Sequence, residues 1–366
     1  MPNAISRDVL RIIPLLDDRT LATVRSMPKI ELHRHLEGSL RLETLVEIGE
    51  AAGIDMPDYD VESLRPFVQM MPDEERSAKH FLSKFNTLRQ FYRSIDIIER
   101  ITYEIVEDAA LDNVKYMELR FTPKALCNIT DLDLEKIVPF VCDVANAAAD
   151  EFGIMVRHIV SMNRHEPVEL GESVLRAALN NRDKGVVGID LAGDEANFSG
   201  LEFRSLFQRA KSAGLGITVH AGEWGGVESI WNAIGNLGAD RVGHGVAVIE
   251  DPAMTQVLVD RGIALEVCPT SNYLSGVVDS MEAHPIKDLT QRNVLTTINT
   301  DDPLICNVDL SQEIAATMLA QNISLDEMKH YQIRAARAAF LDGSEREDLV
   351  RQFQGYMESV EVPSGD

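Results

Sequence analysis

The sequence predicts an α/β fold, a (β/α)8 TIM barrel with extra helices after the first strand and at both termini. Two observations favour this fold: the alternation of apolar runs with helical stretches, and the number of these units, which is eight. Eight short apolar runs, each ending in polar residues, alternate with longer stretches of helical character. Strands that alternate with helices form parallel sheets, and eight such units can close a barrel. The 366 residues contain no internal repeat and no Pro- or Ser-rich linker, so we expect a single domain over residues 1–366.

The strands are expected where these apolar runs fall. In chain order they are Lys29–Leu36, Val114–Phe121, Val156–Asn163, Val186–Gly193, Gly216–Glu223, Asp240–Val246, Ala264–Ser271 and Leu295–Pro303. Amphipathic spacing predicts helices between the later strands at Phe203–Ala213 and Glu228–Leu237. A third helix is predicted at Ala253–Arg261, because an Asp-Pro helix start precedes it.

The regions outside this alternation predict the extra helices. Residues 40–110 are too many for one helix and include the aromatic-rich stretch Phe81–Tyr92. An insertion after a barrel strand covers the carboxyl-terminal face, where barrel enzymes keep their sites. These aromatics could therefore line a pocket or pack against the barrel wall. We expect a capping helix within residues 1–27, closing helices within 310–342, and a helix end with a frayed polar tail at about 344–366.

The amino-acid composition indicates which binding partners and which cellular compartment to expect. The chain has 59 acidic and 35 basic residues, a net charge of −24, which argues against binding to nucleic acid or to anionic lipid. No apolar run is long enough for a membrane span, and the start of the chain lacks signal-peptide character. The four widely spaced cysteines predict reduced core thiols. We therefore expect a cytoplasmic protein; the sequence assigns no oligomeric state.

Histidines and carboxylates gather at the ends of the expected strands. Four of the nine histidines lie there, and two aspartates end the last strand: His33, His35, His220, His244, Asp301 and Asp302. In a barrel, the carboxyl ends of all strands meet at one face. Residues almost 270 positions apart are thus predicted to face one pocket.

The pair His33 and His35 is the first candidate for metal binding. Positions i and i+2 of a strand project to the same face, so one strand can offer two imidazoles to one ion. An isolated pair of this kind is more often two ordinary surface or core histidines. The addition of His220 and Asp301 from other strand ends favours a metal, and this ligand set suits Zn²⁺, or else iron or cobalt.

The neighbouring polar residues have both chemical and ordinary interpretations. Glu223, three residues after His220, could shuttle protons beside a metal or could simply begin a helix. His244, between two glycines, could be a further ligand or a base. Asp301 and Asp302 point to opposite faces, so one could bind metal and the other substrate. The remaining histidines are predicted to be surface or packing residues: His80, His158, His165, His284 and His330.

Six segments resemble the adenosine deaminase family, the metal-dependent purine deaminases of the amidohydrolase superfamily. They are PKIELHRHLEGSL (28–40), DLAGDE (190–195), TVHAGEWG (218–225), RVGHGV (241–246), EVCPTSNYLSG (266–276) and NTDDPLI (299–305). They occur in the family's order. The resemblance implies a (β/α)8 barrel that holds one Zn²⁺ through His33, His35, His220 and Asp301, and that acts on a small-molecule purine nucleoside.

The resemblance also implies the reaction. Adenosine, with 2′-deoxyadenosine, would be deaminated at C6 to inosine and ammonia. Glu223 would protonate purine N1, His244 would orient the attacking water and help to deprotonate it, and Asp301 would accept its proton. The substrate-binding residues would be His35, Glu37, Gly193 and Asp302. Among these, Asp302 matches the partner of N7, and the Gly193 backbone N–H matches the partner of N3.

One position departs from the adenosine-type pattern. Glu37 stands where that pattern has the Asp that meets the ribose 5′-hydroxyl, and a Glu also occurs in adenine-type members. RVGHG and DDPLI are similar to the adenosine type, which favours a nucleoside. Adenine deaminase stays an alternative, as does a deaminase of a 5′-modified adenosine such as aminodeoxyfutalosine. A barrel without catalysis that serves as a binding protein is the alternative of another class.

Overall fold

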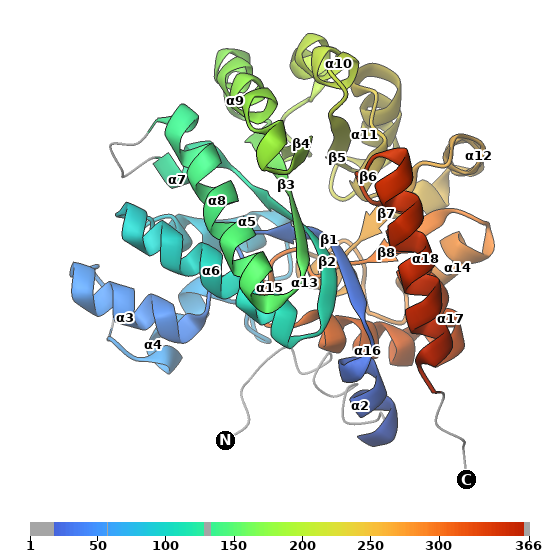
Figure 1. Cartoon of the computed structure of the whole chain (residues 1–366), viewed down its shortest axis with the longest axis horizontal. Coiled ribbons are helices and arrows are strands. Elements are labelled where there is room, and N and C mark those ends of the chain that lie inside the picture. Colours follow the sequence, from blue (N-terminus) through green and yellow to red (C-terminus); the bar gives the residue numbers. More distant parts are fainter. Residues whose placement is uncertain (1–17, 57, 128–132, 362–366) are drawn as a thin grey trace.

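A computed structural model describes residues 18–56, 58–127 and 133–361. Eight parallel strands form one sheet in the order of the sequence (Figure 1). Their bounds are β1 Lys29–His35, β2 Val114–Phe121, β3 Met155–Asn163, β4 Val186–Ala192, β5 Gly216–Ala221, β6 Arg241–His244, β7 Ala264–Val267 and β8 Leu295–Ile298. The predicted (β/α)8 barrel is confirmed.

Helices surround this barrel on the outside (Figure 1). The helices of the first half are α2 Asp18–Ser26, α3 Leu42–Ala52, α4 Val61–Val68, α5 Ala78–Leu88, α6 Ile95–Leu111, α7 Pro123–Cys127, α8 Leu134–Phe152 and α9 Val168–Asn180. Those of the second half are α10 Arg204–Ser212, α11 Gly226–Asn232, α12 Pro252–Arg261, α13 Pro269–Leu274, α14 Ile286–Gln291, α15 Pro303–Cys306, α16 Leu310–Gln321, α17 Leu325–Ala338 and α18 Gly343–Ser359. The extra helices after the first strand and at both ends of the described chain are thus present.

The amino-terminal end of the described chain agrees with the prediction, and the carboxyl-terminal end does not. Helix α2 lies within the predicted cap, and residues 1–17 lie outside the described residues. The expected frayed tail differs from the structure, in which α18 continues to Ser359. The side chains of Leu349, Phe353 and Met357 recur every four residues and are buried. This apolar stripe packs the helix beside α17 (Figure 1), and residues 362–366 lie outside the described residues.

Several strands are shorter than the apolar runs that predicted them. The run Ala264–Ser271 is a strand only to Val267, and the run Leu295–Pro303 is a strand only to Ile298. Pro269 and Pro303 each lie at the start of a short helix, because proline lacks the N–H that a strand would use. The polar residues that follow these strands therefore lie outside the ladder, Asp301 and Asp302 before α15 and Thr270 and Ser271 within α13.

The insertion between β1 and β2 holds four helices, α3 to α6. The stretch Phe81–Tyr92 serves both predicted purposes: Phe81 and Phe85 line a pocket, while Tyr92 is buried in the core. The Tyr92 hydroxyl donates to the carbonyl oxygen of Glu37 at 3.0 Å. The insertion thus supports the segment that follows β1.

The barrel closes through a narrow seam between β1 and β8. These strands share no continuous ladder and are joined by one isolated bridge. The His35 N–H donates to the Asp301 carbonyl at 2.8 Å, and the Asp301 N–H donates to the His33 carbonyl at 2.9 Å. Below them, the Leu32 N–H donates to the Asn299 side chain at 3.0 Å. Two candidate ligand segments therefore form the seam itself.

Within the described residues, no helix combines the length and apolar character that a membrane crossing requires. The four cysteines are all free thiols.

Candidate metal centre and active site

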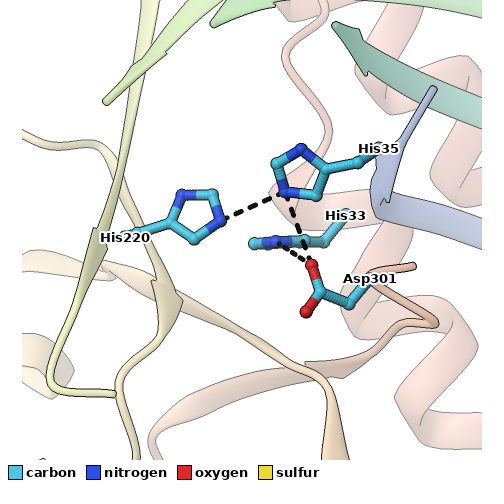
Figure 2. Close-up of side chains that lie close together, drawn as sticks. All are labelled: His33, His35, His220 and Asp301. Carbon is cyan, nitrogen blue, oxygen red and sulfur yellow. Dashed lines mark hydrogen bonds and ion pairs between the residues drawn. The ribbon is translucent and has the colours of Figure 1, made fainter. Parts of the chain in front are cut away.

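Three histidines and one aspartate converge at the carboxyl ends of β1, β5 and β8 (Figure 2). His35 Nε2 lies 3.2 Å from His220 Nε2 and 3.4 Å from Asp301 Oδ1, and His33 Nε2 lies 3.2 Å from the same Asp301 oxygen. All four side chains are buried, and one ligand atom from each lies within 4.8 Å of the others. His33 and His35 reach this point together because alternate residues of β1 share a face.

This group has the features of a metal site. His33 Nε2 is buried 3.2 Å from Asp301 Oδ1 without a well-formed hydrogen bond, and two histidine Nε2 atoms face each other, an arrangement that a cation would satisfy. The opposite ring nitrogens are held by carboxylates: His33 Nδ1 by Glu266 at 2.8 Å and His220 Nδ1 by Asp190 at 3.0 Å. Such contacts place the proton on Nδ1 and leave Nε2 free to bind an ion. The donor set fits Zn²⁺.

The backbone is strained at two of the candidate residues. Among the described residues, six that are not glycine have positive φ, and four of them are asparagines. The other two are His244, at 60°, and Asp301, at 62°. Such conformations are costly for these residue types and persist where the surrounding structure imposes them, which is common at functional sites.

Two glycines of the sequence motifs make room for the cluster. A Cβ atom at Gly38 would lie 1.8 Å from Asp302 Oδ1, and a Cβ at Gly243 would lie 3.0 Å from a carbon of the His33 ring. The segment after β1 can therefore approach Asp302 this closely only with glycine at position 38, and glycine at position 243 relieves a tight contact between β6 and the His33 ring.

Glu223 is held over the cluster by a carboxylate that the sequence did not single out. Glu195 accepts backbone hydrogen bonds from Gly222, Glu223 and Trp224 at 2.6, 3.1 and 3.2 Å. The Glu223 carboxyl faces His244 Nε2 at 3.5 Å. Burial raises its pKa well above the usual value, and the nearby carboxylate of Asp301 adds to this shift. Glu223 is therefore a carboxylic acid that can donate a proton.

The adjacent residues Asp301 and Asp302 have pKa values that move in opposite directions. Burial alone would raise the pKa of Asp301, but its bond to His33 and the surrounding histidines pull it well below the usual value. Burial and the charge of Asp301 raise the pKa of Asp302 well above the usual value. Asp301 is thus an anion, and its Oδ2 accepts from the Ser271 hydroxyl at 2.7 Å. Environments that separate two carboxyl groups in this way assign them different chemical roles.

His244 is almost fully buried beside the cluster. Its ring centroid lies 4.9 Å from that of His33 and 5.2 Å from that of His220. Burial lowers its pKa well below the usual value, so the ring is neutral. The His244 ring also lies within ligand distance of Cys268 and Asp301, but burial raises the pKa of the Cys268 thiol, which disfavours the thiolate form that binds metals.

The pocket above the cluster has a volume of about 660 Å³. Of the nine residues singled out from the sequence, His33 lies beneath the floor and eight line the pocket: His35, Glu37, Gly193, His220, Glu223, His244, Asp301 and Asp302. A larger cavity of about 1490 Å³ lies at the amino ends of the strands and carries none of these groups. The predicted residues are thus brought to one place.

Glu37 lies at the edge of this group and is nearly buried. Its Oε1 accepts from the Thr122 N–H at 2.5 Å, whereas its Oε2 is buried without a partner. Burial raises its pKa to about 7. Arg89 and Lys79 also line the pocket, so cations are present that the sequence near Glu37 did not reveal.

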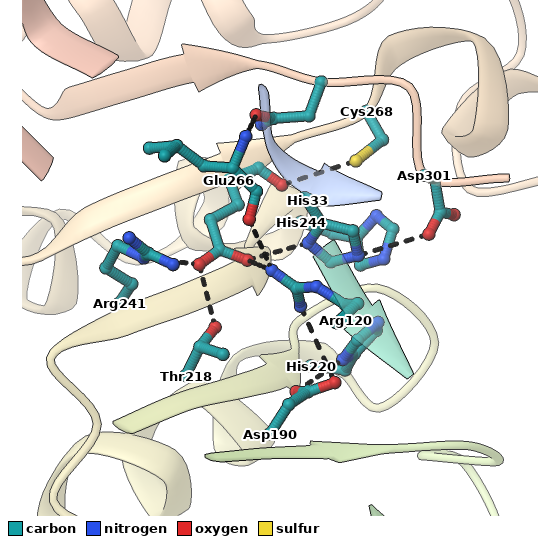
Figure 3. A network of polar contacts seen from close by, with 12 residues as sticks. His33, Arg120, Asp190, Thr218, His220, Arg241, His244, Glu266, Cys268 and Asp301 are labelled. Atoms are coloured by element: carbon teal, nitrogen blue, oxygen red, sulfur yellow. Dashed lines mark hydrogen bonds and ion pairs between the residues drawn. The ribbon is translucent and has the colours of Figure 1, made fainter. Parts of the chain in front are cut away.

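Beneath the cluster, the barrel interior contains a network of buried charges (Figure 3). Glu266 accepts from Arg241 Nε at 2.6 Å, from Arg120 Nη2 at 2.7 Å and from the Thr218 hydroxyl at 2.9 Å, besides its contact with His33. Arg120 also lies 3.6 Å from Asp190, the partner of His220. The arginines keep the pKa of Glu266 well below its usual value despite burial, so it remains an anion that can hold His33.

Sequence reasoning missed these supporting residues. Glu266 and Asp190 lie inside otherwise apolar strands, and a carboxylate at such a position is the signal that could have revealed them. His284 was predicted to be a surface or packing residue; it is buried, and in addition it bonds to Asn272, which bonds to His244. His165, predicted in the same way, lines the pocket. Their own sequence contexts carry no signal of these contacts.

Comparison with known proteins agrees with this geometry. The profile of the adenosine deaminase family matches residues 28–356. The adenosine deaminase of Vibrio parahaemolyticus is 38% identical over 325 residues, which cover 89% of this chain and 97% of that protein. The crystal structure of an adenine deaminase from Arthrobacter aurescens superposes with a TM-score of 0.83 at 25% identity, covering 91% of this chain and all of the other.

A second solved structure, an amidohydrolase from Burkholderia ambifaria with bound zinc, gives a TM-score of 0.83 at 25% identity and covers 94% of this chain and 95% of the other. The barrel and its buried histidine–aspartate group therefore place the protein among amidohydrolase-type enzymes. Within that class, the extent of the family match and the identity to curated relatives show that the chain belongs to the adenosine deaminase family.

Proposed function

We propose that this protein is a zinc-dependent hydrolase that deaminates adenosine and 2′-deoxyadenosine at C6, producing inosine or deoxyinosine and ammonia. The observation that carries the proposal is the pairing, within one pocket, of a histidine–aspartate metal group with a buried, protonated Glu223. Membership of the family supports the reaction type.

We assign His33, His35, His220 and Asp301 as the residues that would hold the ion. A Zn²⁺ ion there would act as a Lewis acid and make hydroxide available near neutral pH. Glu266 and Asp190 would keep two of the imidazoles in the tautomer that binds metal.

The pocket residues supply the proton transfers and the orientation of the purine. Glu223 would donate its proton to N1, which makes C6 more electrophilic. Asp302, protonated because its pKa is raised, would donate a hydrogen bond to N7, and the Gly193 N–H would meet N3. Asp301, as the anion, would accept the proton of the nucleophile. The oxygen of the nucleophile would bond to C6, and the proton taken up by Asp301 would pass to the amino group. Ammonia would then leave as the C6–N bond breaks and the C6 carbonyl forms, and the hydroxyl proton would restore Glu223.

The substrate choice rests on the outer part of the pocket. The unpartnered Glu37 Oε2 is an atom that a sugar hydroxyl could satisfy, which favours a nucleoside over adenine. A 5′-extended adenosine that carries an anionic group is a second candidate, because Arg89 and Lys79 line the same pocket. Adenine deaminase and a non-catalytic binding protein are less favoured, since the first leaves Glu37 unpaired and the second leaves the acid and metal groups unused.

We also propose a cytoplasmic location, which the four free cysteines and the acidic composition support.

Ammonia release by zinc-loaded protein tests the proposal. Adenosine, 2′-deoxyadenosine, adenine, AMP and a 5′-extended adenosine are compared side by side. Turnover of the two nucleosides far above that of adenine supports the proposal. A preference for adenine or for the extended compound replaces the substrate assignment, and no turnover of any purine by zinc-bound protein rejects the activity.

A further inference from the structure

We propose that Asn272 and His284 are positioning residues that hold His244 with its proton on Nε2, so that this histidine presents an N–H donor to the pocket. The proposal deepens the proposed function, because the catalytic consequence rests on that function. The hydrogen-bond chain itself does not depend on it.

The series of hydrogen bonds begins at a backbone N–H, which can only donate. The Ile286 N–H donates to His284 Nδ1 at 3.1 Å, so Nδ1 carries no proton. His284 is 3% exposed, and burial lowers its pKa to about 3, so the ring is neutral. The proton of His284 is therefore on Nε2.

The next contact orients the amide of Asn272. His284 Nε2 lies 3.2 Å from Asn272 Oδ1, and the Nε2–H must donate to that oxygen. The opposite orientation of the amide would direct its NH2 group at the N–H of His284, placing two donors face to face. Amide orientation is normally ambiguous, but here the backbone N–H of Ile286 decides it.

The last contact assigns the tautomer of His244. With its oxygen toward His284, Asn272 directs Nδ2 at His244 Nδ1 over 3.0 Å, so Nδ1 accepts. An imidazole whose Nδ1 accepts carries its proton on Nε2, and in His244 this is the nitrogen that lies 3.5 Å from Glu223 Oε2 at the pocket. All three residues are buried, so water does not compete for these bonds.

The consequence concerns the division of labour in the proposed reaction. An N–H at this position can donate a hydrogen bond to the attacking oxygen but cannot take its proton. The proton acceptor is then Asp301, whose Oδ2 is already held by the Ser271 hydroxyl at 2.7 Å. This revises the expectation from the family resemblance that His244 helps to deprotonate the water.

Nitrogen NMR of the zinc-loaded full chain tests the tautomer directly. Histidine is labelled with ¹⁵N, two-bond correlations are recorded, and His244→Asn identifies the ring signals. We expect an unprotonated Nδ1 and a protonated Nε2 for His244. Protonated Nδ1, on a neutral or a cationic ring, overturns the proposal. This measurement needs no turnover, so it separates failure of the tautomer from failure of the proposed function.

Substitutions test the relay. In Asn272→Asp the carboxylate would accept from both rings and move the His244 proton to Nδ1, so we expect kcat to fall about 10–100-fold with KM little changed. His284→Gln keeps an N–H donor toward Asn272, whereas His284→Leu removes it. Near-normal kcat in the Gln variant, a fall in the Leu variant and similar thermal stability of both support the relay. An unchanged His244 spectrum in Asn272→Asp, or equal kcat of the Gln and Leu variants, overturns it.

Discussion

Two neighbouring buried polar regions of this barrel, the interior charge network and the pocket, differ in how their polar groups are paired. In the interior network, Arg120 and Arg241 face Glu118, Glu266 and Asp190, so each charge lies against an opposite charge. Arg120 Nε and Nη1 make no hydrogen bond, but Nη1 lies in an ion pair, 3.6 Å from Asp190. In the pocket above, Glu37 Oε2 and Asp302 Oδ1 are carboxyl oxygens without a hydrogen-bond partner. Pairing is what stability requires of buried charge, and unpaired groups in a pocket are what a ligand can satisfy.

The pKa shifts repeat this contrast. In the network, the arginines overcome burial and keep Glu266 anionic. In the pocket, burial dominates and raises the pKa of Glu223 and Asp302. Substitutions in the pocket should therefore change activity more than stability, and substitutions in the network should change stability more than activity.

Glu223→Gln is the sharpest test on the pocket side. The amide cannot donate the proton, so we expect kcat to fall about 10²–10⁴-fold. Because the fold holds this carboxyl neutral at a cost that an amide does not incur, the free energy of unfolding at pH 7 should rise rather than fall in the variant. Steady-state kinetics, zinc content and denaturation are measured together. Normal turnover would show that Glu223 is not the proton donor.

Arg241→Met is the matching test on the network side. Arg241 bonds to Glu118, Glu266 and the Ala338 carbonyl and stacks on Phe340 at 3.6 Å from the ring centroid. Its loss leaves the buried Glu118 carboxylate without its ion-pair partner and Glu266 with Arg120 alone, so we expect a loss of about 3–5 kcal/mol in unfolding free energy.

The control for Arg241→Met is Arg351→Met, which breaks an exposed pair and should cost about 0–1 kcal/mol. Equal losses in the two variants by denaturant titration would remove the distinction between the regions.

His220→Ala lies on the border, because His220 joins the pocket to Asp190. Zinc at a hundredfold excess over its Kd should stabilise the parent protein by about 2.7 kcal/mol. The variant should lose this response, since one of the four proposed ligands is missing. Thermal unfolding with and without zinc measures it. An unchanged zinc response would exclude His220 from the ligand set.

His158 provides a buried histidine outside both regions, and the pH dependence of stability tests it. Burial lowers its pKa to about 3 from the usual 6.5, so the unfolded chain binds the proton first as the pH falls. The stabilising contribution is complete above pH 6.5 and is lost toward pH 3, at about 1.4 kcal/mol per unit, or about 2 kcal/mol at pH 5.

His158→Gln should therefore lose about 2 kcal/mol less than the parent protein between pH 7 and pH 5, as measured by denaturation at both values. His330→Gln, at an exposed position, serves as the control and should follow the parent. If His158→Gln follows the parent as well, burial of this ring does not govern the acid sensitivity.

Glu37→Asp carries the smallest expected effect. The shorter side chain loses reach in the pocket, so kcat/KM for adenosine should fall by no more than about tenfold, near 1.4 kcal/mol. Adenine lacks the sugar, and its kcat/KM should stay unchanged. Parallel kinetics with both substrates decide the point, and an equal fall for adenine would place Glu37 at the base rather than at the sugar.

Pattern in the sequence was sufficient for the barrel, its eight strands and seven of the nine residues found at or beside one pocket, whereas Glu37 and Gly193 came from the family resemblance. Alternation of elements and polar strand ends are local signals, and the topology of the barrel does the rest. The ends of β7 and β8 were predicted too long, because an apolar run does not show where a proline begins a new helix. The frayed tail was predicted to begin too early, because the widely spaced Leu349, Phe353 and Met357 bury one face of a mostly polar helix.

The supporting residues of the site could not be predicted in the same way. Glu195, Asn272 and His284 act through contacts with residues that are 12 to 29 positions away and on other elements. A single sequence does not state which side chains will meet across a folded pocket. The resemblance to a family supplied roles for the residues that touch the substrate and none for those that hold them.

The seam between β1 and β8 has a consequence for how the state of the molecule can be observed. The amides of His35 and Asp301 are donors in the bonds that close the barrel, and the side chains of the same residues belong to the metal group. An ion bound there would cross-link the segments that follow the first and the last strand. The rate of hydrogen exchange at those two amides would then report whether a metal ion is bound, since exchange should be slow with the ion present and faster without it.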